Sequence, residues 1–269
     1  MSDQSPLNDL LVLMERLRDP HTGCPWDRAQ TYATIVPYTI EEAYEVADAI
    51  AREDWAELRD ELGDLLFQVV FYAQIAREEG RFDFDDVARG IVEKMTRRHP
   101  HVFADAHYAD AAEQTAAWER LKAAEKAEPP AGTLSGIPLA LPALTRAVKL
   151  QKKASKVGFD WGALEPILAK IQEEIGEIRH EITTQAPTER LDDELGDVLF
   201  AVANLARHLK LDPEAALRGT NAKFERRFQQ IEHWLAEQGR GPAESTLEEM
   251  DDLWERAKRE ERDRSDDGK

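Results

Sequence analysis

Two stretches of this chain of 269 residues repeat one pattern of acidic and apolar residues. The first runs Glu41-Glu-Ala-Tyr-Glu45 and then Glu61-Leu-Gly-Asp-Leu-Leu-Phe67. The second runs Glu173-Glu-Ile-Gly-Glu177 and then Glu194-Leu-Gly-Asp-Val-Leu-Phe200. The later acid pair begins 16 residues after Glu45 and 17 residues after Glu177. A repeated frame of this kind predicts two copies of one structural unit.

The acids in each stretch have the spacing of one helix face. Glu173 and Glu177 are i,i+4 neighbours, Glu174 and Glu177 are i,i+3 neighbours, and Glu194 and Asp197 are again i,i+3. Two such helices packed face to face would gather their carboxylates into a cage of oxygen ligands. Because carboxylate oxygens suit Mg2+, which completes its shell with water and substrate phosphates, we expect a magnesium site here.

The repeated frame makes this prediction specific. Acidic residues number 54 of 269, so the pattern acid-acid-x-x-acid should occur about twice by chance. A solvated helix face is therefore the simpler explanation for any single acid. Chance does not supply the second acid pair inside a nearly identical apolar frame, so the paired set favours a functional site.

Composition indicates a globular, helical protein. Hydrophobic residues make up 42% of the chain and charged residues 33%, which argues against disorder. The net charge of -19 disfavours nucleic acid and anionic membranes as partners. We expect no secretory signal, and no apolar run is long enough to span a bilayer. The single cysteine, Cys24, cannot form an intrachain disulfide, and we expect a cytoplasmic protein.

The densest run of proline and glycine, which ends at Pro138, divides the chain. We expect an N-terminal domain over residues 1–127, a linker over 128–138 and a C-terminal domain over 139–269. No segment alternates as a strand would, so the predicted fold is all-α, with two tandem helical bundles. Thr34 or Thr39 is expected to cap the helix that carries Glu41.

Basic residues and a tryptophan also repeat. Lys223, Arg226 and Arg227 lie within one helical turn or so of each other, and Trp254 follows on the next predicted helix. These cations could neutralise the far end of a polyphosphate, and the tryptophan could stack on a base. Taken alone, the basic residues are more simply explained as a solvated, salt-bridged helix face, and the tryptophan as a core residue. The N-terminal counterparts are Lys94, Arg97, Arg98 and Trp118.

Other chemistries have less support. A di-iron bundle usually requires Glu-x-x-His on two helices, and only His180 lies three residues after an acid of the motif, Glu177. The chain has no Gly-x-x-x-x-Gly-Lys-Ser/Thr loop, which argues against a P-loop nucleotidase. It also has no Gly-x-Ser-x-Gly motif, so covalent nucleophilic catalysis is not indicated.

The two acidic motifs, together with Cys24-Pro-Trp-Asp27, resemble the all-α nucleoside triphosphate pyrophosphohydrolases, and the likeness to the two-domain MazG members runs from about Leu7 to Lys258. The resemblance implies hydrolysis of NTPs and dNTPs, ATP among them, between the α and β phosphates. The products would be a nucleoside monophosphate and pyrophosphate, with Mg2+ as cofactor. It also implies a homodimer in which helices of both subunits complete the two MazG-like bundles.

The family pattern carries over to this chain residue by residue. The metal ligands would be Glu174, Glu177, Glu194 and Asp197, and Glu173 joins them in the catalytic set. The expected nucleotide contacts are Lys170, Ile171, Gln172, Glu173, Glu174, Arg190, Leu191, Asp192, Asp193, Lys223, Phe224, Glu225, Arg226, Arg227 and Trp254.

Both halves keep the motif, and a second candidate metal site consists of Glu42, Glu45, Glu61 and Asp64. In some members only the C-terminal half is catalytic, and we expect the same here, although the N-terminal set lacks no ligand. The rival hypothesis is an acidic helical dimer that binds a partner protein through vestigial sites. The motifs do not specify base or sugar preference, normal or damaged nucleotides, or a regulatory partner.

Overall fold

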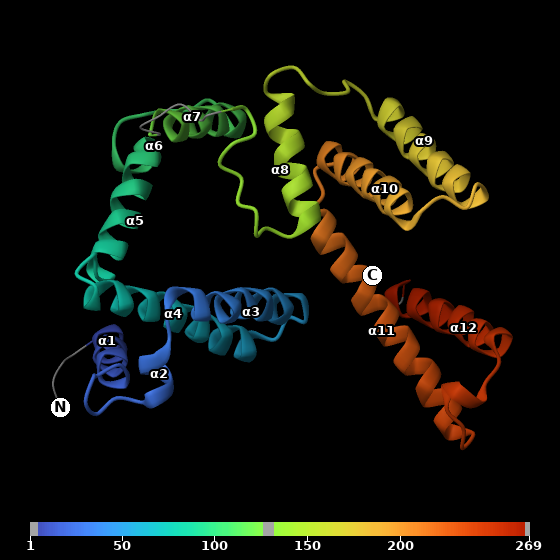
Figure 1. Ribbon diagram of the computed structural model, residues 1–269, viewed down its shortest axis with the longest axis horizontal. Helices are drawn as coiled ribbons and strands as arrows, with labels where there is room; N and C mark the ends of the chain where they lie inside the picture. Colours follow the sequence, from blue (N-terminus) through green and yellow to red (C-terminus); the bar gives the residue numbers. More distant parts are fainter. Residues whose placement is uncertain (1–4, 126–131, 267–269) are drawn as a thin grey trace. The chain divides into compact units, whose positions relative to one another are not determined.

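The computed structural model describes residues 5–125 and 132–266, which form twelve α-helices, one short 3-10 helix and no strand. The prediction of an all-α fold is therefore confirmed over the described chain. None of these helices is both long enough and apolar enough to cross a membrane. Residues 1–127 and 128–269 form two compact units (Figure 1). Of the expected linker, residues 128–131 lie outside the described residues.

The N-terminal unit is organised around one long helix pair, α3 and α4, which pack along each other. Helix α1 packs on α4, α5 also contacts α4, and α7 packs on α5. The helices of this unit are α1 (Pro6–Leu17), α2 (Pro25–Ala29), α3 (Tyr32–Ala51), α4 (Trp55–Glu78), α5 (Phe84–Arg98), α6 (Pro100–Phe103) and α7 (Ala111–Ala124).

The C-terminal unit repeats this order of helices. Helices α9 and α10 form the long pair, α8 packs on α10, α11 contacts α8, and α12 packs on α11. The bounds are α8 (Ala143–Ser155), α9 (Leu164–Thr183), α10 (Thr188–His208), α11 (Pro213–Glu237), the 3-10 helix η1 (Pro242–Glu244) and α12 (Leu247–Asp266). The acidic motifs thus lie on the equivalent pairs α3–α4 and α9–α10.

The helix that carries Glu41 begins earlier than its sequence suggests. Thr31 is the N-cap of α3, and its hydroxyl and backbone exchange hydrogen bonds with those of Thr34 in a capping box. Thr39 lies inside the helix, where its hydroxyl donates to the carbonyl of Ile35. The expectation of a cap at Thr34 or Thr39 was therefore wrong. Pro37 lies inside α3, at its sixth position, where it removes one backbone hydrogen bond but does not end the helix.

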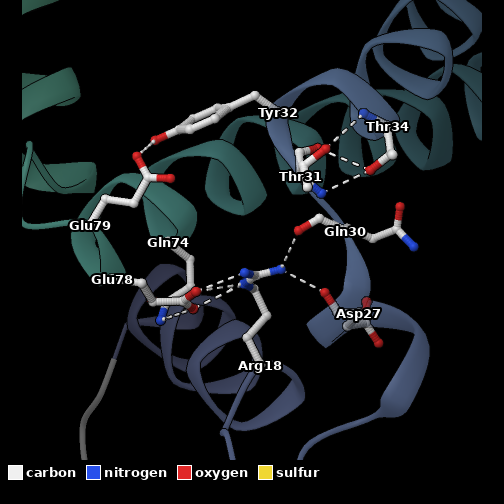
Figure 2. A network of polar contacts seen from close by, with 9 residues as sticks. All are labelled: Arg18, Asp27, Gln30, Thr31, Tyr32, Thr34, Gln74, Glu78 and Glu79. Carbon is white, nitrogen blue, oxygen red and sulfur yellow. Dashed lines mark hydrogen bonds and ion pairs between the residues drawn. The ribbon is translucent and has the colours of Figure 1, made fainter.

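Arg18 joins the loop after α1 to helix α4 in the N-terminal unit (Figure 2). Its side chain is 7% exposed and donates to the carbonyl oxygens of Asp27 and Gln30 and to the carboxylate of Glu78. The guanidinium also lies 5.3 Å from the ring centre of Phe71, a residue of the buried core. Burial alone would raise the pKa of Glu78, but hydrogen bonds from Arg18 and Gln74 lower it. One arginine thus fixes the segment that follows α1 against the core.

Candidate active site

Helices α9 and α10 bring three carboxylates of the C-terminal motif together. Ligand oxygens of Glu174, Glu194 and Asp197 all lie within 4.8 Å of one another. Glu174 is 4% exposed and Glu194 is 7% exposed, whereas Asp197 faces solvent. Ionised carboxylates this close repel one another, so the cluster has the geometry of a site that a bound cation would stabilise.

Glu177 adjoins this cluster from the solvent side. A hydrogen bond with Glu174 raises the pKa of Glu177, and burial together with the charges of Glu174 and Glu194 raises it further. The pKa of Glu174 is lowered, chiefly by the hydrogen bond from Lys170. Of these two carboxylates, Glu174 is therefore the one that ionises more readily.

Two cations face the buried acids. The Lys170 Nζ lies 2.6 Å from Glu174 and 2.9 Å from Glu173, and these bonds raise the pKa of the lysine. An Arg190 nitrogen lies 3.2 Å from Glu194. The pairs Lys170–Glu174 and Arg190–Glu194 are i,i+4 neighbours on one helix, so the helix geometry itself places each cation beside its acid. Glu173 points to Lys170 and is not part of the group of three.

The carboxylate cluster fits a divalent cation of the magnesium type. Glu174 Oε1 receives the Lys170 ammonium, but its Oε2 is buried and, apart from the neighbouring Glu177 carboxyl, has no hydrogen-bond partner. A buried charged oxygen without a partner is costly, and a cation beside it would remove that cost. Oxygen-only ligands at this spacing are the donor set that Mg2+ prefers.

A cavity of about 250 Å³ opens beside these acids. Glu174, Asp197 and Lys170 line one part of it, so the charged groups form part of its wall. The remaining wall consists of Gln151, Trp161, Ile167, Phe200, Ala201 and Asn204. Pockets that combine an apolar wall with a few polar groups are typical small-molecule sites.

The N-terminal acids also converge, but in a different charge environment. Oxygens of Glu42, Glu45 and Glu61 lie within 4.8 Å of one another. Burial, followed by the charges of Asp64, Glu45 and Glu61, raises the pKa of Glu42, and the pKa of Glu61 is raised similarly. The Gln68 amide reaches Glu42 at 3.5 Å, the limit of a hydrogen bond.

The predicted basic and aromatic contacts form a separate cluster on α11 and α12. Arg227 donates to Glu261 at 2.8 Å, and its guanidinium lies 5.5 Å from the ring centre of Trp254. The Phe224 ring lies 5.1 Å from that of Trp254, and Arg226 also pairs with Glu261, at 3.7 Å. These arginines contact the α12 carboxylate and not the α9–α10 acids, so a single chain does not gather the whole predicted set into one pocket.

The N-terminal unit repeats this arginine cluster. Arg97 and Arg98 both bind Glu125, and the guanidinium of Arg98 lies 5.4 Å from the ring centre of Trp118. The bonds from Arg98 and Arg97 outweigh burial and lower the pKa of Glu125 to about 2. Trp118 and Trp254 thus each lie against an arginine of their own unit. The sequence had suggested only a core position or a base-stacking role for these tryptophans.

The other predicted contacts lie on the surface of α9, α10 and α11. Ile171, Leu191 and Lys223 are half-buried. Gln172, Asp192, Asp193 and Glu225 are exposed. Six residues of the cavity wall were not among the predicted site residues: Gln151, Trp161, Ile167, Phe200, Ala201 and Asn204. A signal existed for Asn204, because the repeat aligns it with Phe71, where a polar residue replaces a core aromatic.

Comparison with known families identifies the two repeats. The model of the MazG nucleotide pyrophosphohydrolase domain matches residues 30–103 and again residues 163–231. These two matches contain both acidic motifs and together cover slightly more than half of the chain.

Curated relatives match nearly the whole length. A nucleoside triphosphate pyrophosphohydrolase of Escherichia coli K12 is 52% identical over 262 residues, which is 96% of this chain and 98% of the relative. A Thermotoga maritima protein named nucleoside triphosphate pyrophosphohydrolase/pyrophosphatase MazG is 43% identical over 93% of this chain and 94% of its own. A Mycolicibacterium smegmatis nucleoside triphosphate pyrophosphohydrolase is 39% identical over 57% of this chain and 47% of its own.

Proposed function

Because the chain belongs to the MazG nucleotide pyrophosphohydrolase family, we propose that its C-terminal half hydrolyses nucleoside triphosphates, both NTPs and dNTPs, between the α and β phosphates. The products are a nucleoside monophosphate and pyrophosphate. The observation that carries this proposal is the buried carboxylate cluster of Glu174, Glu194 and Asp197 beside a cavity that Lys170 also lines. Such a hydrolase would act on the cytoplasmic nucleotide pool, in its control or sanitation.

Glu174, Glu177, Glu194 and Asp197 would hold Mg2+, which when bound neutralises phosphate charge and polarises the phosphorus being attacked. Lys170 keeps Glu174 ionised in the protein, as the lowered pKa of that glutamate indicates. The negative cluster would otherwise repel a triphosphate, so the cation at each buried acid also lowers the cost of binding the substrate.

The remaining carboxylate of the motif, Glu173, is placed to act on the attacking water. Glu173 lies outside the group of three, is exposed, and is held 2.9 Å from the Lys170 Nζ. A carboxylate fixed beside the cluster can orient the attacking water or accept its proton. We assign this role to Glu173.

We also propose that the protein is a homodimer. Leu168, Ile175 and Ile182 repeat every seven residues on α9, and each is more than 40% exposed. Leu195 and Leu199 continue an exposed apolar face on α10. Such a stripe is typical of a helix that packs on another helix, and a second copy with the same stripe would bury it. The partner could also bring its own α11–α12 cluster of arginines and tryptophan to the carboxylates.

Sedimentation velocity of wild type and of Leu168→Glu tests the dimer. We expect a dimer for wild type and a monomer for the variant, since a charge in a buried apolar interface is not tolerated. The matched control is His180→Glu, which adds a negative charge at an exposed position of the same helix, about a third of a turn away from the stripe, and should leave the dimer intact. A wild-type monomer at micromolar concentration would contradict the proposal.

The catalytic half is tested by disabling each cluster in turn. Glu174→Gln with Glu177→Gln should reduce pyrophosphate release from dNTPs with Mg2+ by about 1,000-fold or more, because the charged ligands are lost. The matched pair Glu42→Gln with Glu45→Gln should retain most of the activity. Full activity of the C-terminal pair would show that the wrong half was chosen.

The identity of the product tests the reaction itself. Monophosphate and pyrophosphate are expected, and inorganic phosphate would indicate cleavage at the γ phosphate. Wild-type protein that released neither from any natural triphosphate would favour the protein-binding alternative.

A further inference from the structure

Two buried amide side chains line the cavity beside the carboxylate cluster. Gln151, from α8, is 8% exposed, and Asn204, from α10, is 2% exposed. An amide has a donor end and an acceptor end, and the neighbours of each amide determine which end is free.

Gln151 keeps an acceptor free. Its Nε2 donates to the carbonyl oxygen of Phe200 at 2.8 Å, and a carbonyl can only accept, so this end must be the nitrogen. The other end, Oε1, is buried and has no hydrogen-bond partner. A buried acceptor without a partner costs stability unless a ligand supplies a donor.

Asn204 keeps a donor free. Its Oδ1 accepts from Arg207 Nε at 3.0 Å and from Arg207 Nη2 at 2.8 Å. Because a guanidinium can only donate, the amide oxygen must face the arginine, which leaves the Nδ2 end for a ligand. Arg207 also binds Asp160, the residue before the cavity-lining Trp161, so one arginine fixes two parts of the wall.

These amides lie at the end of the cavity away from the acids. Asn204 follows Asp197 by seven residues, about 10 Å along an α-helix, and Phe200 and Ala201 lie one turn after Asp197. On α9, Ile167 precedes Glu174 by the same seven residues. A nucleotide whose phosphates lie at the carboxylates would pass its sugar along Phe200 and Ala201 and bring its base to the level of Asn204.

We propose that this end of the cavity is a nucleobase site that reads a hydrogen-bonding edge, an inference that rests on the proposed function. Gln151 Oε1 accepts from an N–H of the base, and Asn204 Nδ2 donates to the adjacent ring nitrogen or carbonyl oxygen. Trp161 provides an aromatic surface for the ring. The substrate class is a triphosphate whose base has a hydrogen-bond donor next to an acceptor; in adenine and cytosine these are the exocyclic amino group and the neighbouring ring nitrogen.

The test compares natural substrates with analogues that lack only the donor. Purine riboside triphosphate is ATP without its exocyclic amino group, and pyrimidin-2-one riboside triphosphate is CTP without its amino group. Wild type should show a kcat/KM about 10- to 100-fold lower for each analogue, because Gln151 is then left without a partner. Both analogues are smaller than the parent base, so a steric clash cannot produce this loss.

The variant Gln151→Leu tests whether Gln151 causes the difference in kcat/KM between each nucleotide and its amino-free analogue. Gln151→Leu should lower kcat/KM for ATP and CTP to the level of the analogues and bring the ratio between each pair close to one. Gln74→Leu, at a half-buried amide on α4 of the other unit, should keep the wild-type ratio. Circular dichroism establishes that both variants are folded.

The outcomes separate this inference from the proposed function. Equal turnover of amino and amino-free substrates by wild type would overturn the nucleobase site and leave the hydrolase standing. A wild-type ratio that persists in folded Gln151→Leu would overturn the role of Gln151. Absence of pyrophosphate from every natural triphosphate would instead contradict the proposed function.

Discussion

The two acidic clusters share their carboxylates but differ in the charges around them. Lys170 and Arg190 bind Glu174 and Glu194 in the C-terminal unit. In the aligned repeat, the positions of these two cations are occupied by Tyr38 and Glu57 in the N-terminal unit. The pKa of Glu174 is accordingly lowered, chiefly by Lys170, whereas burial and neighbouring acids raise the pKa of Glu42.

The space beside the clusters differs as well. Asn204 lines a cavity in the C-terminal unit, whereas the aligned Phe71 is 1% exposed and belongs to the core of the N-terminal unit. Ala201 likewise aligns with Gln68, whose amide reaches toward Glu42. A set of converging carboxylates therefore does not by itself create a pocket, because the neighbouring cations and the open space come from other positions.

Exchanging the two aligned residues, Asn204 and Phe71, should have the largest effect on activity and stability. Asn204→Phe is expected to lower kcat/KM by about 100-fold or more, because the ring fills the cavity and displaces the substrate. The reciprocal change, Phe71→Asn, should destabilise the N-terminal unit by about 3–5 kcal/mol, as the loss of a core aromatic does. Steady-state kinetics and thermal unfolding measure the two effects, and unchanged kinetics of Asn204→Phe would contradict the cavity assignment.

Removing a cation should have an intermediate effect. Lys170→Met is expected to reduce kcat/KM about 10- to 100-fold, the value of a charge-assisted hydrogen bond at a buried acid. The matched control Tyr38→Met, at the aligned N-terminal position, should leave pyrophosphate release almost unchanged. Equal losses in the two variants would mean that the charge difference between the halves does not matter for activity.

The smallest effect concerns the loop that carries Trp161. Hydrogen bonds from Arg207, opposed by burial and assisted by His208, lower the pKa of Asp160 from 3.8 to about 2. A lowered folded-state pKa means that the ionised aspartate stabilises the fold above about pH 4, and that this contribution is lost as the pH falls toward 2.

Asp160→Asn should therefore lower the free energy of unfolding at pH 7 by about 1–3 kcal/mol. The difference from wild type should shrink as the pH falls from about 4 to about 2. Chemical denaturation across this range measures it, with the exposed Asp252→Asn as control. A difference that stayed constant with pH would contradict the assigned ion pair. In the N-terminal unit, Arg18 binds the backbone carbonyls of Asp27 and Gln30 and, among the described residues, no side chain of that loop. Replacing a side chain of that loop should therefore change acid stability less than Asp160→Asn does.

The helical pattern was predictable because it depends on local spacing. The acids at i,i+3 and i,i+4 predicted the helix pairs, and Asp54, Asp83 and Asp212 cap α4, α5 and α11. The start of α3 was not predictable in the same way: Thr31, Thr34 and Thr39 are all suitable N-cap residues, and only the capping box that Thr31 forms with Thr34 distinguishes them.

The site was only partly predictable. Three acids of each repeat converge because adjacent helices of one hairpin carry them, which the sequence implies. The sequence did not imply that Arg226, Arg227 and Trp254 form a cluster separate from the acids, because contacts between α11 and α12 depend on long-range packing. The role of Lys170 and Arg190 beside buried acids was visible in the spacing, but their absence from the N-terminal repeat becomes meaningful only when burial is known.

The sequence by itself determined that this protein is all-α, duplicated and rich in paired carboxylates, because these properties follow from residue spacing along single helices. Tertiary structure alone decided which carboxylates are buried, which cations face them and where a cavity remains. Burial and the direction of a side-chain amide depend on residues far apart in the chain, such as Gln151 and Phe200. The difference between the two halves therefore became clear only in the folded molecule.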